Sequence, residues 1–328
     1  MAGQDHDPGA ATRRAVLAGA VAAMAAGGLA RAAEPPIPII DTHIHLFDPN
    51  RPQGAPYVGP RGSSSNTLGA FPDRYRSLMA KHGVVGAIEV EASPWIEDNL
   101  WVLQVSEKDD IMVGFVGNLQ PEKPEFAEYL DRHAKNPLFR GIRYGNLWGY
   151  DLIAQSTNPV FIDGLRRLAR ADLALDTANP TVPLLQAVVR VSDAVPDLRI
   201  VIDHLPRMAL KPEEANAYQA VLAELGRRPQ IYVKLSGVIH QIDGRTSLRI
   251  EDYRSRLDRL AEAFGEDRVM FGSDWPNSDG ASSVDDVVNI MKAYYADKPR
   301  AQAEKYFWRN SLAAYKWAPR SAAQRRLM

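Results

Sequence analysis

The chain has 328 residues, of which 45% are hydrophobic and 24% are charged, and its formal net charge is −1. This composition is typical of a globular protein. The near-neutral charge, without a basic tract, argues against a nucleic-acid partner. The chain contains no cysteine, which excludes disulfides, thiolate nucleophiles and cysteine-ligated zinc.

The first 33 residues have the organisation of an export signal. Arg13 and Arg14 precede an apolar stretch rich in Ala and Gly, which ends in the small-x-small sequence Ala30-Arg31-Ala32. The arginine pair is typical of the twin-arginine type of signal, and the stretch is short for a membrane span. We expect residues 1–33 to be a signal read by the twin-arginine translocase and cleaved near Ala32. Residues 34–328 would then form a single periplasmic domain.

The first strand expected in the mature chain carries two histidines. The apolar run 37–40 leads into Asp41-Thr42-His43-Ile44-His45. Because residues two apart on a strand share a face, both imidazoles converge at the carboxyl end of this strand. Two neutral imidazoles there form half of a site for a zinc-like ion. The alternative is a hydrogen-bonded pair of surface histidines.

The remainder of the mature chain alternates short β-branched runs with longer segments of helical periodicity. Strands are expected at 37–43, 84–91, 111–117, 139–144, 172–177, 199–204, 231–236 and 268–274. Helices are expected near 72–82, 98–109, 124–134, 159–170, 181–194, 213–227, 252–264 and 284–296. Eight such units predict an α/β fold, a single (β/α)8 TIM barrel, with closing helices in 301–317. A doubly wound sheet is the alternative, but its first strand is usually followed by a glycine-rich loop rather than by histidines.

Polar side chains follow most of these expected strands, and the long segment 46–71 is expected to lie over the mouth of the barrel. Reacting groups of such barrels come from the carboxyl ends of the strands. Here those ends carry His43 and His45, Glu91, Arg143 and Tyr144, Asp176, Asp203 to Arg207, Lys234 to Ser236, and Asp274. Burying such groups is costly unless they are paired or ligated, so one shared site is expected.

These motifs resemble the amidohydrolase superfamily, in the branch of TIM-barrel hydrolases that includes sugar lactonases and muconolactone-type lactonases. The matching segments are 41–45, 90–92, 141–143, 203–205, 234–237 and 271–276, in order along residues 37–317. The resemblance implies the barrel fold, a hydrolytic site and a lactone substrate. The chain departs from the binuclear pattern, because Arg143 and Tyr144 replace a bridging lysine and Asp176 replaces a histidine. One metal ion or none is therefore expected.

Chemistry and resemblance together give the strand-end residues their expected roles. His43, His45, Glu91 and Asp274 would ligate one divalent ion, with Zn2+ expected first and Mn2+ second, although some relatives in this branch work without metal. Asp274 is the expected general base. His204 would polarise the substrate carbonyl or complete the metal shell. Lys234 is expected to be a structural charge paired inside the barrel.

Three arginines and a tyrosine are the candidate substrate-binding residues: Arg61, Arg143, Arg207 and Tyr144. Arginine binds carboxylates through two parallel hydrogen bonds, so these positions suit an anionic substrate. Ordinary loop salt bridges are the alternative for each arginine. Several aromatic residues, among them Tyr57 and Trp148, are candidates for the walls of the pocket.

The sequence thus predicts an exported hydrolase that opens a lactone or a similar cyclic ester of a small molecule. A metal-dependent decarboxylase of an unsaturated or aromatic acid is the nearest alternative, because it shares the fold, the histidine pair and the final aspartate. A non-catalytic periplasmic binding protein is the third reading. Retention of His43, His45, His204 and Asp274 argues against it. A homo-oligomer is compatible with the sequence.

Overall fold

The computed structural model describes residues 34–57, 68–242 and 244–328. Its centre is a sheet of eight parallel strands in the order β1-β2-β3-β4-β5-β6-β7-β10. These strands are β1 (Ile39–Ile44), β2 (Val84–Val90), β3 (Met112–Gly117), β4 (Phe139–Arg143), β5 (Ala174–Thr177), β6 (Ile200–Ile202), β7 (Ile231–Lys234) and β10 (Val269–Met270). The sequential order of parallel neighbours is that of a (β/α)8 barrel, so the predicted fold is confirmed.

The sheet closes where the segment after β10 runs beside β1. The amide of Thr42 donates to the Phe271 carbonyl at 3.1 Å, and the amide of Asp274 donates to the His43 carbonyl at 2.9 Å. A further parallel bridge joins Ile44 to Trp275. The seam between the first and last strands therefore lies at the two histidines.

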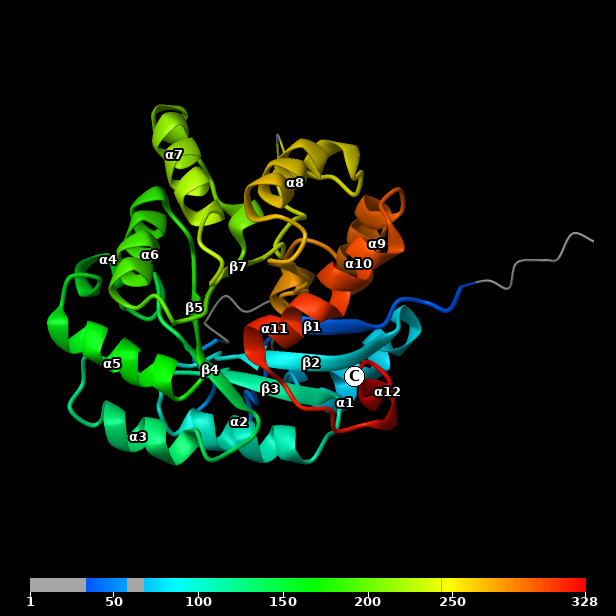
Figure 1. Cartoon of the computed structure of the whole chain (residues 1–328). Coiled ribbons are helices and arrows are strands. Elements are labelled where there is room, and N and C mark those ends of the chain that lie inside the picture. The colour runs from blue at the N-terminus through cyan, green and yellow to red at the C-terminus, as the bar shows by residue number, and fades with distance from the viewer. Residues whose placement is uncertain (1–33, 58–67, 243) are drawn as a thin grey trace, which may run out of the picture. The chain divides into compact units, whose positions relative to one another are not determined.

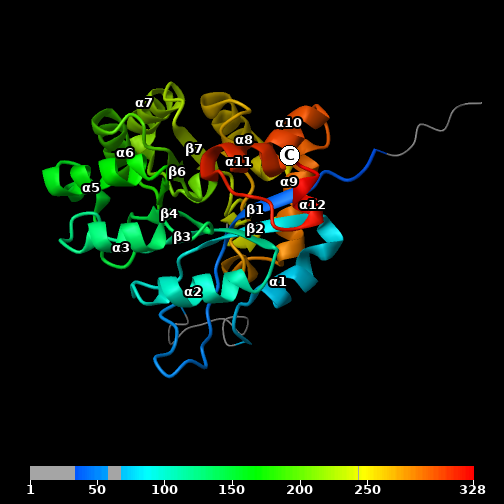
Figure 2. The same cartoon turned by 60° about the horizontal axis from the view of Figure 1, so that its bottom comes forward.

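Helices surround the barrel, as Figures 1 and 2 show. They are α1 (Pro72–Met79), α2 (Asp98–Glu107), α3 (Phe126–His133), α4 (Leu152–Gln155), α5 (Pro159–Arg170), α6 (Val182–Ala194), α7 (Ala215–Gly226), α8 (Glu251–Phe264), α9 (Val284–Tyr295), α10 (Arg300–Glu304), α11 (Asn310–Tyr315) and α12 (Ala322–Arg325). Local signals fix several starts: the Asn158 side chain accepts from the Val160 amide, and Ser283 with Asp286 forms a capping box. Such caps satisfy amides that have no partner within the helix.

Two apolar layers hold these elements together. The larger layer lies between strands and helices and includes Leu165, Val188 and Leu257. The smaller cluster combines barrel residues such as Ile40 and Val201 with residues of the C-terminal segment. In that segment α11 covers the amino-terminal end of the barrel, because Arg199, just before β6, donates to the Ala314 carbonyl at 2.7 Å. The opposite end, with the histidines, is left for a site.

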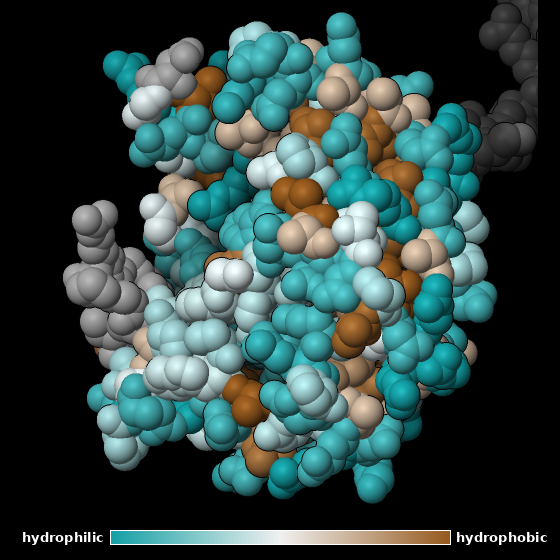
Figure 3. Space-filling view, turned by 90° about the vertical axis from the view of Figure 1, so that its left-hand side faces the viewer, coloured by the Kyte–Doolittle hydropathy of each residue, from teal (hydrophilic) through white to brown (hydrophobic). Residues whose placement is uncertain are grey.

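Small elements were not expected from the sequence. A two-stranded hairpin, β8 (Gln241–Ile242) with β9 (Arg245–Thr246), follows β7, and a π-helical turn spans Lys305–Arg309. The face shown in Figure 3 is largely hydrophilic, with apolar residues scattered among polar ones. Within the described residues, no helix has both the length and the apolar character that a bilayer crossing requires.

Candidate active site

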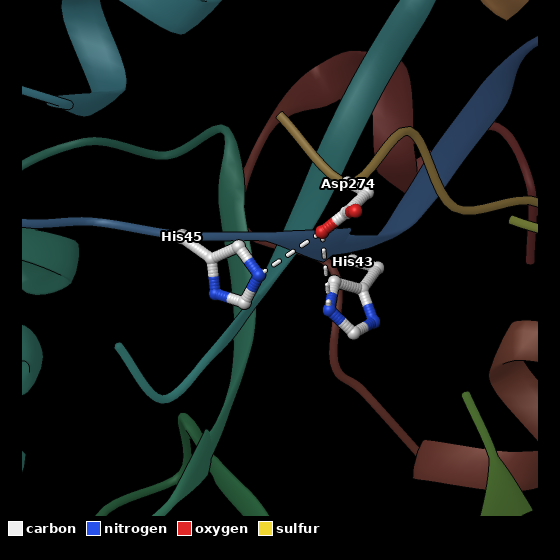
Figure 4. A group of neighbouring side chains, drawn as sticks. All are labelled: His43, His45 and Asp274. Carbon is white, nitrogen blue, oxygen red and sulfur yellow. Dashed lines mark hydrogen bonds and ion pairs between the residues drawn. The ribbon is translucent and has the colours of Figure 1, made fainter. Parts of the chain in front are cut away.

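Three predicted metal ligands meet at the seam of the barrel (Figure 4). β1 supplies His43, His45 follows directly after β1, and the segment after β10 supplies Asp274. Asp274 Oδ1 lies 3.2 Å from His45 Nε2 and 3.8 Å from His43 Nε2. All three side chains are buried, and one ligand atom of each lies within 4.8 Å of the others.

The hydrogen bonds around the two histidines leave Nε2 of each ring directed into this group. His45 Nδ1 lies 2.7 Å from the Val90 carbonyl oxygen. A carbonyl can only accept, so Nδ1 carries the proton and the neutral ring keeps its Nε2 lone pair. His43 Nε2 is buried and has no hydrogen-bond partner among the described residues. Two imidazole nitrogens and one carboxylate oxygen in this arrangement fit a divalent metal ion.

Asp274 has two carboxylate oxygens in different surroundings. Oδ1 faces the histidines and also accepts from Asn277 Nδ2 at 3.2 Å, whereas Oδ2 lies 3.8 Å from Arg207 Nη1. Burial alone would raise the pKa of Asp274, but the charge that the adjacent His204 and His43 rings carry when protonated outweighs burial and holds that pKa well below its usual value. The carboxylate is therefore ionised at neutral pH and can ligate a metal or accept a proton.

His204 stands beside this group at the end of β6. Its Nε2 lies 3.8 Å from Asp274 Oδ1, and its Nδ1 is 2.8 Å from Ser236 Oγ. Burial lowers the pKa of His204, which favours the neutral ring. His204 and Asp274 both have positive φ, 54° and 61°. Non-glycine residues rarely adopt this conformation, and it tends to cluster at functional sites.

A buried ionic network lies beneath the histidines. Lys234 Nζ donates to Asp176 Oδ2 at 2.6 Å and lies 3.0 Å from Asp203 Oδ1. Burial raises the pKa of Asp176, whereas Lys234 and His43 outweigh burial at Asp203 and hold its pKa well below the usual value. The expectation that Lys234 is a charge paired inside the barrel is confirmed.

Glu91 and Arg143 form a buried ion pair near the histidine group. Arg143 Nε donates to Glu91 Oε1 at 2.7 Å, and Trp148 Nε1 donates to Glu91 Oε2 at 2.8 Å. Both charged side chains are buried, and Glu91 belongs to neither metal-compatible group found among the described residues. Glu91 is thus held in an ion pair in this structure, and its place in the metal shell stays a prediction. The guanidinium of Arg143 is engaged by Glu91, and its role in substrate binding stays a prediction.

The other expected substrate-binding residues separate in space. Tyr144 is buried; its hydroxyl donates to Glu122 Oε1 at 3.3 Å and its ring stacks on Tyr150. The role of Tyr144 in substrate binding stays a prediction. Arg61 lies outside the described residues. Arg207 is close to Asp274 Oδ2 and lines a cavity of about 350 Å3, together with His240, Asn277 and Asp274.

Two polar contacts at the site were missed from the sequence. Tyr57, expected only as a wall of the pocket, has its hydroxyl 3.1 Å from His45 Nε2. Asn277 donates to that hydroxyl and to Asp274. The placement of Asn277 three residues after the expected base is the one local signal for its role. No periodicity in the sequence brings residue 57 to the site, because it comes from the long segment after β1.

The chain is similar to known proteins both in sequence and in fold. Residues 40–317 match the model of a family described as amidohydrolase. An L-fucono-1,5-lactonase of Burkholderia multivorans is 28% identical over 284 residues, which cover 84% of this chain and 94% of the relative. A solved amidohydrolase structure from the same species, with bound zinc, is 25% identical with a TM-score of 0.74 and covers 86% of this chain and all of that one.

A decarboxylase is also among the similar structures. The 2,6-dihydroxybenzoate decarboxylase from Rhizobium aligns with a TM-score of 0.61 at 16% identity, covering 85% of this chain and 98% of that one. At this identity the likeness shows the shared fold alone.

Proposed function

This chain belongs to the amidohydrolase family, and from that premise we propose that it hydrolyses a lactone, or a similar cyclic ester, of a small polar molecule. One observation carries the proposal. Asp274 takes part at once in the histidine group through Oδ1 and in the 350 Å3 cavity, near Arg207, through Oδ2. A substrate in the cavity would thus meet an ionised base beside a metal-compatible group. The lactonase relative supports the reaction class.

Different residues of this chain would carry out the separate tasks of hydrolysis. A divalent ion, when bound, supplies Lewis acidity that favours ionisation of water and polarises a carbonyl. His43 and His45 would hold it through Nε2, with Asp274 Oδ1 as the third ligand. Asp274 Oδ2 accepts the proton of the attacking water and returns it to the leaving alkoxide. His204, fixed by Ser236, faces the same carboxylate and is placed to orient the carbonyl.

We propose Zn2+ as the ion, with Mn2+ as the alternative. Imidazole nitrogens suit zinc, and three protein ligands leave a position open, as catalytic zinc sites require. The zinc-containing amidohydrolase structure supports this choice. Elemental analysis of the purified protein is expected to find about one equivalent of a divalent ion. A fully active protein without metal would reassign His43 and His45 to substrate binding.

The substrate is proposed to carry an anionic group that Arg207 receives. Arg207 lines the cavity and its side chain is 63% exposed, so its guanidinium is available to a ligand. Arg207→Met is expected to raise KM for lactones with a carboxylate while changing KM little for neutral sugar lactones. Equal effects on both classes would assign Arg207 to the support of Asp274.

Oxygen labelling separates hydrolysis from decarboxylation. A panel of neutral sugar lactones, lactone carboxylates and aromatic acids is assayed in H2(18)O. We expect one heavy oxygen in the product carboxylate and proton release at neutral pH, because the product is a carboxylic acid. Release of CO2 without label on the best substrate would establish the decarboxylase instead. Binding without turnover across the panel would favour the binding-protein reading.

We further propose export by the twin-arginine route. The basis is the arginine pair and the A-x-A sequence in residues 1–33, which lie outside the described residues. Changing Arg13 and Arg14 to Lys is expected to hold a longer precursor in the cytoplasm, seen by fractionation and mass. Unchanged export of this variant would indicate the general secretory route.

A further inference from the structure

We propose that the ammonium group of Lys234 occupies a second cation position beneath the active site, so that the centre takes one divalent ion rather than two. This inference rests on the proposed metal centre at His43, His45 and Asp274. It concerns how many ions that centre admits, which is a property separate from the reaction it catalyses.

The surroundings of Lys234 are those of a bound cation. Its Nζ lies 2.6 Å from Asp176 Oδ2, 3.0 Å from Asp203 Oδ1 and 3.3 Å from His43 Nδ1. Asp176 accepts a hydrogen bond from the ammonium, Asp203 forms an ion pair with it, and His43 Nδ1 lies close by; the three groups come from three separate strand ends. All four side chains are fully buried. Tyr315 of α11 adds a further hydrogen bond to Asp176 Oδ2 at 2.7 Å.

A second metal-compatible group overlaps this position. His43, Asp203 and His204 place one ligand atom each within 4.8 Å of the others, and all three are buried. Lys234 touches two of these three residues, Asp203 and His43. A divalent ion bound between them would lie beside the ammonium, where the repulsion of like charges is strong because the site is buried.

Removing the ammonium would leave buried carboxylate oxygens that are free to bind another cation. Neither carboxylate oxygen of Asp203 accepts a hydrogen bond within the part of the chain that the structure describes, and the same holds for Asp176 Oδ1. Asp203 also lies 3.7 Å from Arg143 Nη1, too far for a strong hydrogen bond. Two buried carboxylates without their cation favour the capture of another one. With His43 Nε2 assigned to the first ion, Asp203 and His204 remain as donors, and a metal ion is the cation that they suit.

The test counts ions in Lys234→Ala, which removes the ammonium and leaves space. Wild-type and variant proteins are stripped with a chelator, dialysed against Mn2+ and measured by elemental analysis and electron paramagnetic resonance. We expect about one ion per wild-type chain and about two in the variant, with the spectrum of a coupled pair. Lys292→Ala is the matched control, because Lys292 of α9 is a half-buried lysine that donates to the His82 carbonyl. It is expected to bind one ion.

The number of bound ions tests whether Lys234 excludes a second ion. Two ions in the wild type, or one ion in folded Lys234→Ala, would overturn the role of Lys234. If the single variant fails to fold, Lys234→Ala is combined with Asp176→Asn, which removes one of the unpaired carboxylates and keeps the His43, Asp203 and His204 group. One ion in this folded double variant also overturns the inference. No ion in the wild type would refute the metal centre itself. Lactone hydrolysis is tested separately, by the assay of the lactone panel.

Discussion

Asp274 shows how much function a single residue can combine. Its positive φ of 61° turns the side chain so that Oδ1 meets the histidines, while its amide closes the barrel against the His43 carbonyl. Oδ2 is left toward Arg207 and the cavity. Ligation, barrel closure and proton transfer therefore all depend on one position. Substitution of Asp274 by asparagine can separate barrel closure from proton transfer, because asparagine keeps the shape of the side chain but cannot act as a base.

Asp274→Asn is expected to keep the fold and lower kcat by about 10^3 or more, because an amide cannot accept the water's proton. Asparagine tolerates positive φ, so the backbone should survive. Steady-state kinetics and circular dichroism measure the two effects. Asp279→Asn, in the following turn, is the control and should retain activity. Near-normal turnover in folded Asp274→Asn would exclude Asp274 as the base.

The Glu91–Arg143 pair is expected to act on stability rather than on metal binding. Arg143→Met leaves Glu91 buried without its partner, which costs about 3–5 kcal/mol. Adding Glu91→Gln to Arg143→Met should recover part of this loss, as measured by urea unfolding of the two single variants and the double variant. Elemental analysis of Glu91→Gln is expected to find the wild-type metal content. Loss of the ion from that variant would restore Glu91 as a ligand.

At the scale of strands and helices, the periodicity of apolar residues predicts the regular elements, but it does not predict the structure of irregular segments. The eight strands and their helices follow from alternating patterns, and strand ends pointed to His43, His204 and Asp274 because parallel strands share a carboxyl edge. Arg143 and Tyr144 are neighbours, so only one of them can face the barrel interior. The structure turns Arg143 inward.

Long-range contacts account for the rest. The ion pair that occupies Glu91 joins β2 to β4, and its partner could be named from sequence only as one of several arginines. Tyr57 reaches His45 from an irregular segment, where no period fixes the direction of a side chain. The last strand, β10, spans just two residues; directly after it the Phe271 carbonyl accepts from the Thr42 amide and the Phe271 amide donates to the Tyr306 carbonyl.

Close packing between neighbouring strands gives an element-scale prediction. A Cβ at Gly141 of β4 would lie 2.4 Å from the Ala174 carbonyl oxygen of β5, and backbone cannot move aside as a flexible side chain can. Gly141→Ala is expected to destabilise the fold by about 1–3 kcal/mol, the usual cost of overpacking. Gly280→Ala is the control, because nothing lies within 4 Å of its added Cβ. Equal urea midpoints for both variants would contradict this packing.

For the whole molecule, the proposed ion lies where the barrel is closed. His45 and Asp274 are 229 residues apart in sequence, yet their side chains meet at 3.2 Å across the seam between β1 and the segment after β10. An ion bound to both would tie the first strand to the last. Only the folded chain brings these ligands together, so metal binding and folding must be linked.

Metal binding is therefore expected to raise the melting temperature of the entire barrel. At a free ion concentration of 100 times Kd the gain is about 2.7 kcal/mol, since the folded state alone binds. For a domain of this size that corresponds to roughly 5–10 °C. Calorimetry of chelated and metal-loaded protein measures the shift, which should grow with the logarithm of free ion concentration. Asp274→Asn removes a ligand across the seam, so its gain should be much smaller. A shift of equal size in that variant would place the ion elsewhere in the protein.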